Sequence, residues 1–156
     1  LLRFQVGSSL YWNDIWWQTA RNFTLEASPP DTLAGPAYDE NVSLPQHLKV
    51  EDHSTLFLLF CAKTMLAVVF NDIPQAAAHA RAARASLKGG VGMHAEPLFH
   101  FYESLAVLAD VDGKDHRLRI VALRMAARNQ KKLRHWADHA PMAVHDCPRL
   151  ARRFAG

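Results

Sequence analysis

Histidine and cysteine side chains near the C-terminus form the most metal-like grouping in this sequence. His135 and His139 lie four residues apart, which on a helix places both imidazoles on one face, and His145 and Cys147 follow shortly after. Zinc accepts imidazole and thiolate ligands in such groupings. In helical zinc peptidases, however, a glutamate next to the first histidine acts as the general base, and position 136 is tryptophan. We therefore assign no metal ligand and favour surface or helix-capping roles for these histidines.

Other sequence patterns that support catalysis or nucleotide binding are missing. The chain has no Gly-x-Ser-x-Gly elbow, no phosphate-binding Gly-x-x-x-x-Gly-Lys-Ser/Thr loop, and no strand before its glycine cluster at 89–92. The acidic segment 110–115 is a poor calcium loop, because its glycine is misplaced and Val121 occupies the position of the bidentate acid. The sequence thus predicts a segment that is not an enzyme, with no catalytic, cofactor-binding or metal-binding residue.

Length and composition indicate a single globular domain over residues 1–156. The chain is 49% hydrophobic and 21% charged, which excludes a disordered chain. Charge is divided unevenly, because residues 1–113 carry seven Lys/Arg and twelve Asp/Glu whereas residues 114–156 carry eleven and three. Since no recognised nucleic-acid motif accompanies the basic part, we expect no nucleic-acid partner and favour a solvated face or a contact with an acidic module.

Hydrophobic periodicity predicts five helices, at 10–25, 52–70, 72–88, 97–109 and 116–140. The segment 52–88 organises the rest: a nearly all-apolar helix turns at residues 71–74 into an alanine-rich one. Asp72 suits the N-cap, Pro74 the first turn, and Gly89 and Gly90 the helix end. The apolar run 56–70 is too short to span a membrane and contains Lys63, so we predict a buried central helix.

Residues 28–52 are predicted to be a long connecting loop, because five prolines and glycines interrupt any regular pattern. Within this loop, residues 37–40 are a candidate contact segment, although a solvated crossing between helices is the favoured alternative. The tail at 143–156 is left unassigned. The buried Cys61 suggests a reducing, cytoplasmic setting.

Five predicted sets of residues complete this assignment. An aromatic stripe on the first helix is interpreted as core, with Gln18 on the opposite polar side. The helix 97–109 is predicted to bury a large apolar face. The alanines of 72–88 permit close packing while its charged residues face solvent, and 116–140 has one apolar and one basic face. The aromatic stripe consists of Trp12, Ile15, Trp16, Thr19 and Phe23, and the apolar face of 97–109 consists of Leu98, Phe101, Tyr102, Leu105, Leu108 and Ala109. The charged residues of 72–88 are His79, Arg81, Arg84 and Lys88. In 116–140 the apolar face consists of Leu118, Ala122, Met125, Asn129, Leu133, Trp136 and Ala140, and the basic face consists of Arg117, Arg124, Arg128, Lys131 and His135.

The central hairpin resembles a tetratricopeptide unit. Ala76, Ala80 and Ala83 match the small-residue spacing of its second helix, and Phe60 stands at the large aromatic position of the first. Thr64 and Ala67 depart from the Gly and Tyr of that pattern. This resemblance implies antiparallel helical hairpins stacked as a short all-α solenoid.

Longer strings resemble the helical region of large bacterial multidomain signalling kinases. They are PLFHFYESL at 97–105, NQKKLRHWADHAPM at 129–142, AGPAYDE at 34–40 and FNDIPQA at 70–76. In that family a serine/threonine kinase module and an AAA-type ATPase module precede this region, and a GAF sensor and a histidine kinase follow. Beyond Met142 the similarity ends.

This resemblance implies a non-catalytic scaffold, part of a longer cytoplasmic chain, that couples ATPase and kinase modules in signal transduction. Its partners would be the neighbouring modules or another protein, with no membrane span, and the kinase and ATPase residues would lie outside residues 1–156. Two alternatives remain open: a free-standing peptide-binding adaptor of tetratricopeptide type, and a small metal-dependent helical enzyme built on His135 and His139.

Overall fold

The computed structural model describes residues 2–24, 29–111 and 115–139, and these residues fold into helices. No strand occurs in these ranges, where the one β-type pairing is an isolated bridge between Ala34 and Asp39. The predicted all-α class is therefore confirmed. The helices are α1 (Leu2–Thr24), α2 (Glu40–Lys49), α3 (His53–Val69), α4 (Ile73–Ala85), the 3₁₀ turn η1 (Leu87–Gly89), α5 (Ala95–Ala109) and α6 (His116–His139).

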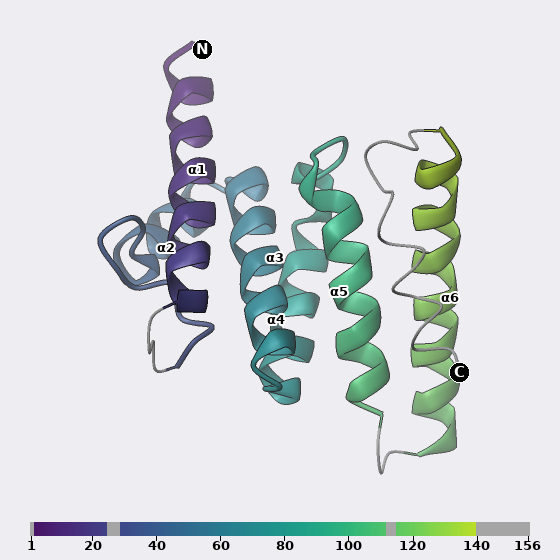
Figure 1. Cartoon of the computed structure of the whole chain (residues 1–156). Helices are drawn as coiled ribbons and strands as arrows, with labels where there is room; N and C mark the ends of the chain where they lie inside the picture. Colours follow the sequence, from purple (N-terminus) through teal and green to yellow (C-terminus); the bar gives the residue numbers. More distant parts are fainter. Residues whose placement is uncertain (1, 25–28, 112–114, 140–156) are drawn as a thin grey trace.

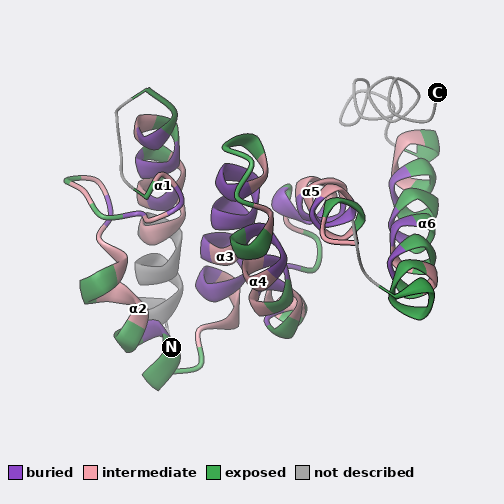
Figure 2. Cartoon of the chain, turned by 90° about the horizontal axis from the view of Figure 1, so that it is seen from below, coloured by how far each residue is buried: buried purple, intermediate pink, exposed green. Residues whose placement is uncertain are grey.

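The spatial order of the helices follows their order in the chain (Figures 1 and 2). Helices α1 and α2 lie at one end, α3 and α4 form the middle, and α5 and then α6 complete the other end. Consecutive helices α3 and α4 pack against each other, as do α5 and α6, and α3 also contacts α1, α2 and α5. None of the described helices is both long and apolar enough to cross a membrane.

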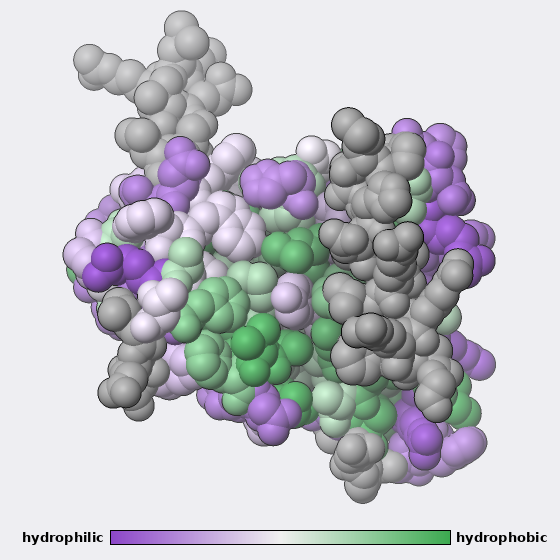
Figure 3. Space-filling model, viewed as in Figure 1, coloured by the Kyte–Doolittle hydropathy of each residue, from purple (hydrophilic) through white to green (hydrophobic). Residues whose placement is uncertain are grey.

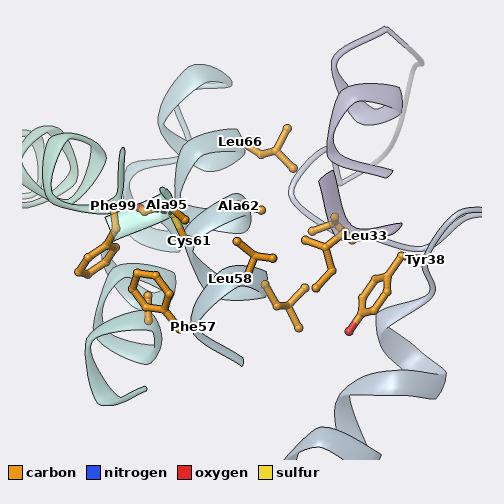
Figure 4. Packing of buried hydrophobic residues seen from close by; sticks show 12 residues of the cluster. Leu33, Tyr38, Phe57, Leu58, Cys61, Ala62, Leu66, Ala95 and Phe99 are labelled. Atoms are coloured by element: carbon orange, nitrogen blue, oxygen red, sulfur yellow. Dashed lines mark hydrogen bonds between the residues drawn. The ribbon is translucent and has the colours of Figure 1, made fainter. Parts of the chain in front are cut away.

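Helix α3 is the centre of the core, as predicted (Figure 4). On one side Leu58, Ala62 and Leu66 approach Leu33 and Tyr38 of the segment before α2. On the other side Phe57 meets Phe99 of α5 edge to face, with ring centroids 5.4 Å apart. These residues are all buried. Because each buried large apolar side chain contributes about 1.5–3 kcal/mol, a helix buried on two opposite sides holds the two ends of the fold together.

The central hairpin turns where the sequence predicts. The Asp52 carboxylate accepts from the Thr55 amide at 3.1 Å at the start of α3, and Asp72 accepts from the Gln75 amide at 3.2 Å at the start of α4. Between the two helices, Asn71 adopts a φ of 60°, a left-handed conformation that asparagine tolerates better than most residues. Helix α4 ends at Ala85, slightly before the predicted glycines.

Gly89 and Gly90 serve packing instead of ending α4. A Cβ on Gly90 would lie 2.3 Å from the Phe57 ring, and one on Gly89 would lie 2.3 Å from the His53 backbone carbon. No side chain fits at such distances, so the two glycines let η1 lie directly on the first turn of α3. The glycine cluster between two helices thus has a steric explanation.

The prediction that residues 28–52 form a loop without regular structure is wrong, because α2 occupies its second half. Asp39 caps α2 by accepting from the Asn41 amide at 2.9 Å. Pro45 lies inside the helix, where it removes one backbone hydrogen bond. The ion pair of Glu40 with α3 and the ring contacts of His47 with Tyr11 and Tyr38 offset that loss. Residues 37–40 are accordingly neither a solvated crossing nor an exposed contact, but part of the packed fold.

Three predicted faces also need correction. The predicted apolar face of α5 is half-buried to exposed, whereas the face that packs on its neighbours contains Phe99, His100, Glu103, Ser104 and Ala106. Gln18, predicted on the polar side of α1, is buried. Arg81 of α4 and Lys88 of η1 are exposed as expected, but His79 and Arg84 of α4 pair with acids of other elements. In each case a polar side chain is buried because a partner on another element satisfies it.

Candidate functional site

A buried hydrogen-bond network joins α4, α5 and α6. His100 and Glu103 project from α5, Asn129 from α6 and Arg84 from α4. His100, Glu103 and Asn129 are almost completely buried, whereas 35% of the Arg84 side chain is exposed. We call these four residues, together with Lys132 at the outer end, the α4–α6 network.

The direction of each hydrogen bond follows from the chemistry of its two ends. The Lys132 ammonium can only donate, so the His100 Nε2 atom, 3.3 Å away, must be the acceptor. His100 therefore carries its proton on Nδ1 and donates it to Asn129 Oδ1 at 3.0 Å. Asn129 Nδ2 then donates to Glu103 Oε2 at 2.8 Å. The two ends thus fix which ring nitrogen of His100 donates to Asn129 and one orientation of the Asn129 amide.

Arg84 closes the network at Glu103. Its Nε atom donates to Glu103 Oε1 at 2.5 Å, and a second guanidinium nitrogen donates to Oε2. Burial by itself would raise the pKa of Glu103, but the nearby donors of His100, Arg84 and Asn129 outweigh burial and hold that pKa below its ordinary value. Glu103 is therefore a buried carboxylate that stays charged.

A second group of ionisable side chains links α2 and the segment before it to α3 and α4. Lys63 of α3 donates to both carboxylate oxygens of Glu40 at 2.7 and 2.8 Å. His79 Nε2 of α4 lies 2.6 Å from Asp31 Oδ2, and the Phe60 ring stacks on the imidazole. Burial lowers the pKa of His79, so its neutral form donates to Asp31. All four ionisable groups thus have their partners inside the fold.

The segment before α2 is also anchored to α1. Gln18 donates to Asn22 Oδ1 at 2.9 Å and accepts from the Ala37 amide at 3.2 Å. Asn22 donates in turn to the carbonyls of Pro30 and Thr32 at 2.9 and 2.8 Å. These bonds satisfy backbone groups of an irregular segment that would otherwise be buried without partners.

The structure brings together only part of the His135, His139, His145 and Cys147 grouping, to which the sequence analysis assigned no metal. His135 and His139 lie side by side on α6 with ring centroids 4.2 Å apart, but His139 Nδ1 is 2.7 Å from the His135 carbonyl, which fixes it as a donor. His145 and Cys147 lie outside the described residues, as does the unassigned tail. Within the ranges that the structure describes, no three His, Cys, Asp or Glu side chains are placed to hold a metal ion.

His135 also lines a shallow groove along α6. The groove has a volume of about 390 Å³, and its described lining is Arg128, Lys131, Lys132, His135 and Trp136. Four of these five side chains are basic or imidazole groups, so the groove attracts anions. The predicted basic face of α6 is therefore a real surface feature, and it lies directly outside the α4–α6 network.

Taken together, these ion pairs and hydrogen bonds of the described residues connect different elements of the fold. Sequence reasoning missed the α4–α6 network, although one signal was available: Asn129 falls on an otherwise apolar helix face, where a buried amide requires partners. No family model, curated protein or solved structure matches this chain.

Proposed function

We propose that this chain is a non-catalytic helical scaffold within a cytoplasmic multidomain signalling kinase, where it couples ATPase and kinase modules. The observation that carries the proposal is the use of the buried charges. Arg84–Glu103, Lys63–Glu40 and His79–Asp31 each join different elements of the fold. Side chains of the types that could perform catalysis are thus engaged in fixing helices relative to one another.

The strings that resemble the kinase family support the same proposal. The string 97–105 supplies His100 and Glu103 of the α4–α6 network, and the string 129–142 supplies Asn129 and Lys132. These residue types therefore have a structural reason to occur together. In this proposal the hairpins α3/α4 and α5/α6 are units of a tetratricopeptide-like stack within a longer polypeptide.

Activity assays on the 156-residue chain test the non-catalytic role. We expect no ATP hydrolysis and no phosphoryl transfer above buffer controls from a preparation whose circular dichroism is helical. Robust turnover that survives repeated purification would overturn the proposal. The coding sequence on both sides of residues 1–156 tests the kinase context: a reading frame without kinase or ATPase modules would instead favour the free-standing adaptor.

The adaptor alternative is favoured by one observation, the exposed face of α6 with its groove. For the metal-dependent enzyme, the support among the described residues is the adjacent rings of His135 and His139. Metal analysis of the purified chain distinguishes the latter, because a zinc or iron enzyme would retain the ion in stoichiometric amount.

A further inference from the structure

Helix α6 is the last helix in the part of the chain that the structure describes. Among the described helices, α5 is the one against which it packs, through Ala122, Ala126, Asn129 and Leu133. Figure 2 shows exposed residues along the side of α6 that is turned away from α5. In Figure 3, hydrophilic residues gather at the edge of the molecule where α6 stands.

Leu118 and Met125 stand one turn before Ala122 and Asn129, so an apolar seam borders the α5 contact and basic residues lie on its outer side; we call this surface the outer face of α6. Leu118, Val121 and Met125 follow one another at intervals of three and four residues, which places them in line along a helix. Leu118 and Val121 are 53% and 55% exposed. Arg117, Arg124, Arg128, Lys131 and Lys132 flank or extend this seam and are all exposed.

Most of the positive charge of α6 has no recorded ion-pair partner among the described residues. The helix contains seven Lys/Arg and one acid, Asp138. Of the seven, Lys132 lies within ion-pair distance of an acid that the structure describes, Glu96 at 4.0 Å. Most of the described acids of residues 1–113 are engaged elsewhere. Asp39, Asp52 and Asp72 cap helices, and Glu96 accepts from the Gly92 amide. Asp31, Glu40 and Glu103 pair with His79, Lys63 and Arg84.

Charge also excludes two occupants that the chain itself could supply. A second copy paired through the same face would place two basic helices against each other. Residues 140–156 contain three arginines and one aspartate, so they too would add positive charge. Like charges at close range repel, and neither occupant would compensate the arginines.

We propose that the outer face of α6 is a docking surface for an acidic amphipathic helix of a partner protein or module. Its apolar residues would cover Leu118, Val121 and Met125, and its carboxylates would meet the flanking arginines and lysines. An apolar seam at helical spacing favours a helix over a nucleic acid, whose backbone offers no apolar surface to cover it. The proposal rests on the scaffold function and names the chemistry of its partner.

Binding of a synthetic probe peptide to the full 156-residue chain tests this surface. The probe is a helical peptide of about 20 residues, roughly 30 Å long, with leucines along one stripe and glutamates beside them. We expect saturable binding by fluorescence anisotropy that weakens as NaCl is raised. A charge-reversed peptide with lysine in place of glutamate is the matched probe and should not bind.

Charge-reversal variants locate the surface. Arg124→Glu with Arg128→Glu should weaken peptide binding by roughly tenfold or more, because two attractive pairs become repulsive. Arg81→Glu with Lys88→Glu makes the same change in net charge at exposed positions before α5 and should leave binding within about twofold. Val121→Gln should weaken binding without changing its salt dependence. Circular dichroism of each variant confirms that its helical content is retained.

Several results would overturn the proposal. They are absence of peptide binding at millimolar concentration, equal losses in the two charge-reversal variants, or tighter binding of duplex DNA or phosphatidylserine vesicles that depends on Arg124 and Arg128. The scaffold proposal would survive any of these, because it is tested separately by turnover assays and by the flanking coding sequence.

Discussion

Replacing Glu103 with glutamine should destabilise the fold by about 3 kcal/mol. The change removes the negative charge opposite Arg84 and places an NH₂ group among donors. The Arg84 side chain is partly exposed and regains water, so its share of the loss is about 1 kcal/mol. Asn129 is buried and loses its carboxylate acceptor, and an unsatisfied buried donor costs about 1–3 kcal/mol.

Urea unfolding followed by circular dichroism measures this loss. For a chain of this length, about 3 kcal/mol corresponds to a melting temperature lower by about 6–12 °C. Glu51→Gln is the matched control, because it makes the same chemical change at an exposed position. The control should remain within about 0.5 kcal/mol of wild type.

The pH dependence of the unfolding free energy distinguishes the contribution of the Glu103 charge from that of side-chain packing. Because the pKa of Glu103 is lower in the folded state than its ordinary value of 4.5, the carboxylate stabilises the fold above that value. The stabilisation disappears as pH falls through the folded-state pKa. The difference in unfolding free energy between wild type and Glu103→Gln, here called the gap, should therefore shrink from pH 7 to about pH 3. A gap that is unchanged at low pH, or below about 0.5 kcal/mol at pH 7, would refute the assigned role of the carboxylate.

Three further perturbations test other parts of the fold. Gly90→Ala should cost about 1–3 kcal/mol in urea unfolding, since the new methyl group would overlap the Phe57 ring, and an unchanged midpoint would contradict the packing of η1. Burial raises the pKa of the Cys61 thiol to about 12. In a Cys147→Ser variant, Cys61 should therefore react with a disulfide reagent at pH 8 only after denaturation. Rapid labelling of the native chain would count against the burial of Cys61. His79 is held neutral by burial, so the folded state binds fewer protons than the unfolded state, and the unfolding free energy should fall below about pH 6.5. His79→Gln should flatten that slope, and an identical slope in the variant would argue against this residue as its source.

Patterns of local origin were predictable from the sequence. The predicted cap Asp72 acts within three residues of its own position, and the apolar run of α3 demands cover on several sides whatever its neighbours are. Helix α2 was missed because Pro45 and the prolines before it oppose a helix locally. Tertiary contacts of Glu40 and His47 decide in its favour.

The candidate site was less predictable, because its residues meet only after the helices have packed. His100 and Glu103 are neighbours on one helix, but the partners that permit their burial come from positions 84 and 129. The leucines and aromatics of α5 therefore seemed the better candidates for its buried face. Hydrophobicity ranks side chains one at a time, whereas burial of a charge depends on a partner that periodicity does not reveal.

The α4–α6 network also fixes the position of α6 along α5. Sliding α6 by one turn along α5 would bring Met125 or Leu133 to the position of Asn129, and neither side chain can join an imidazole N–H to a carboxylate. The small and apolar residues around Asn129 would tolerate such a shift, but the amide does not. A force applied to α6 should therefore be transmitted to α5 and, through Glu103 and Arg84, to α4. The three helices should then move as one rigid unit.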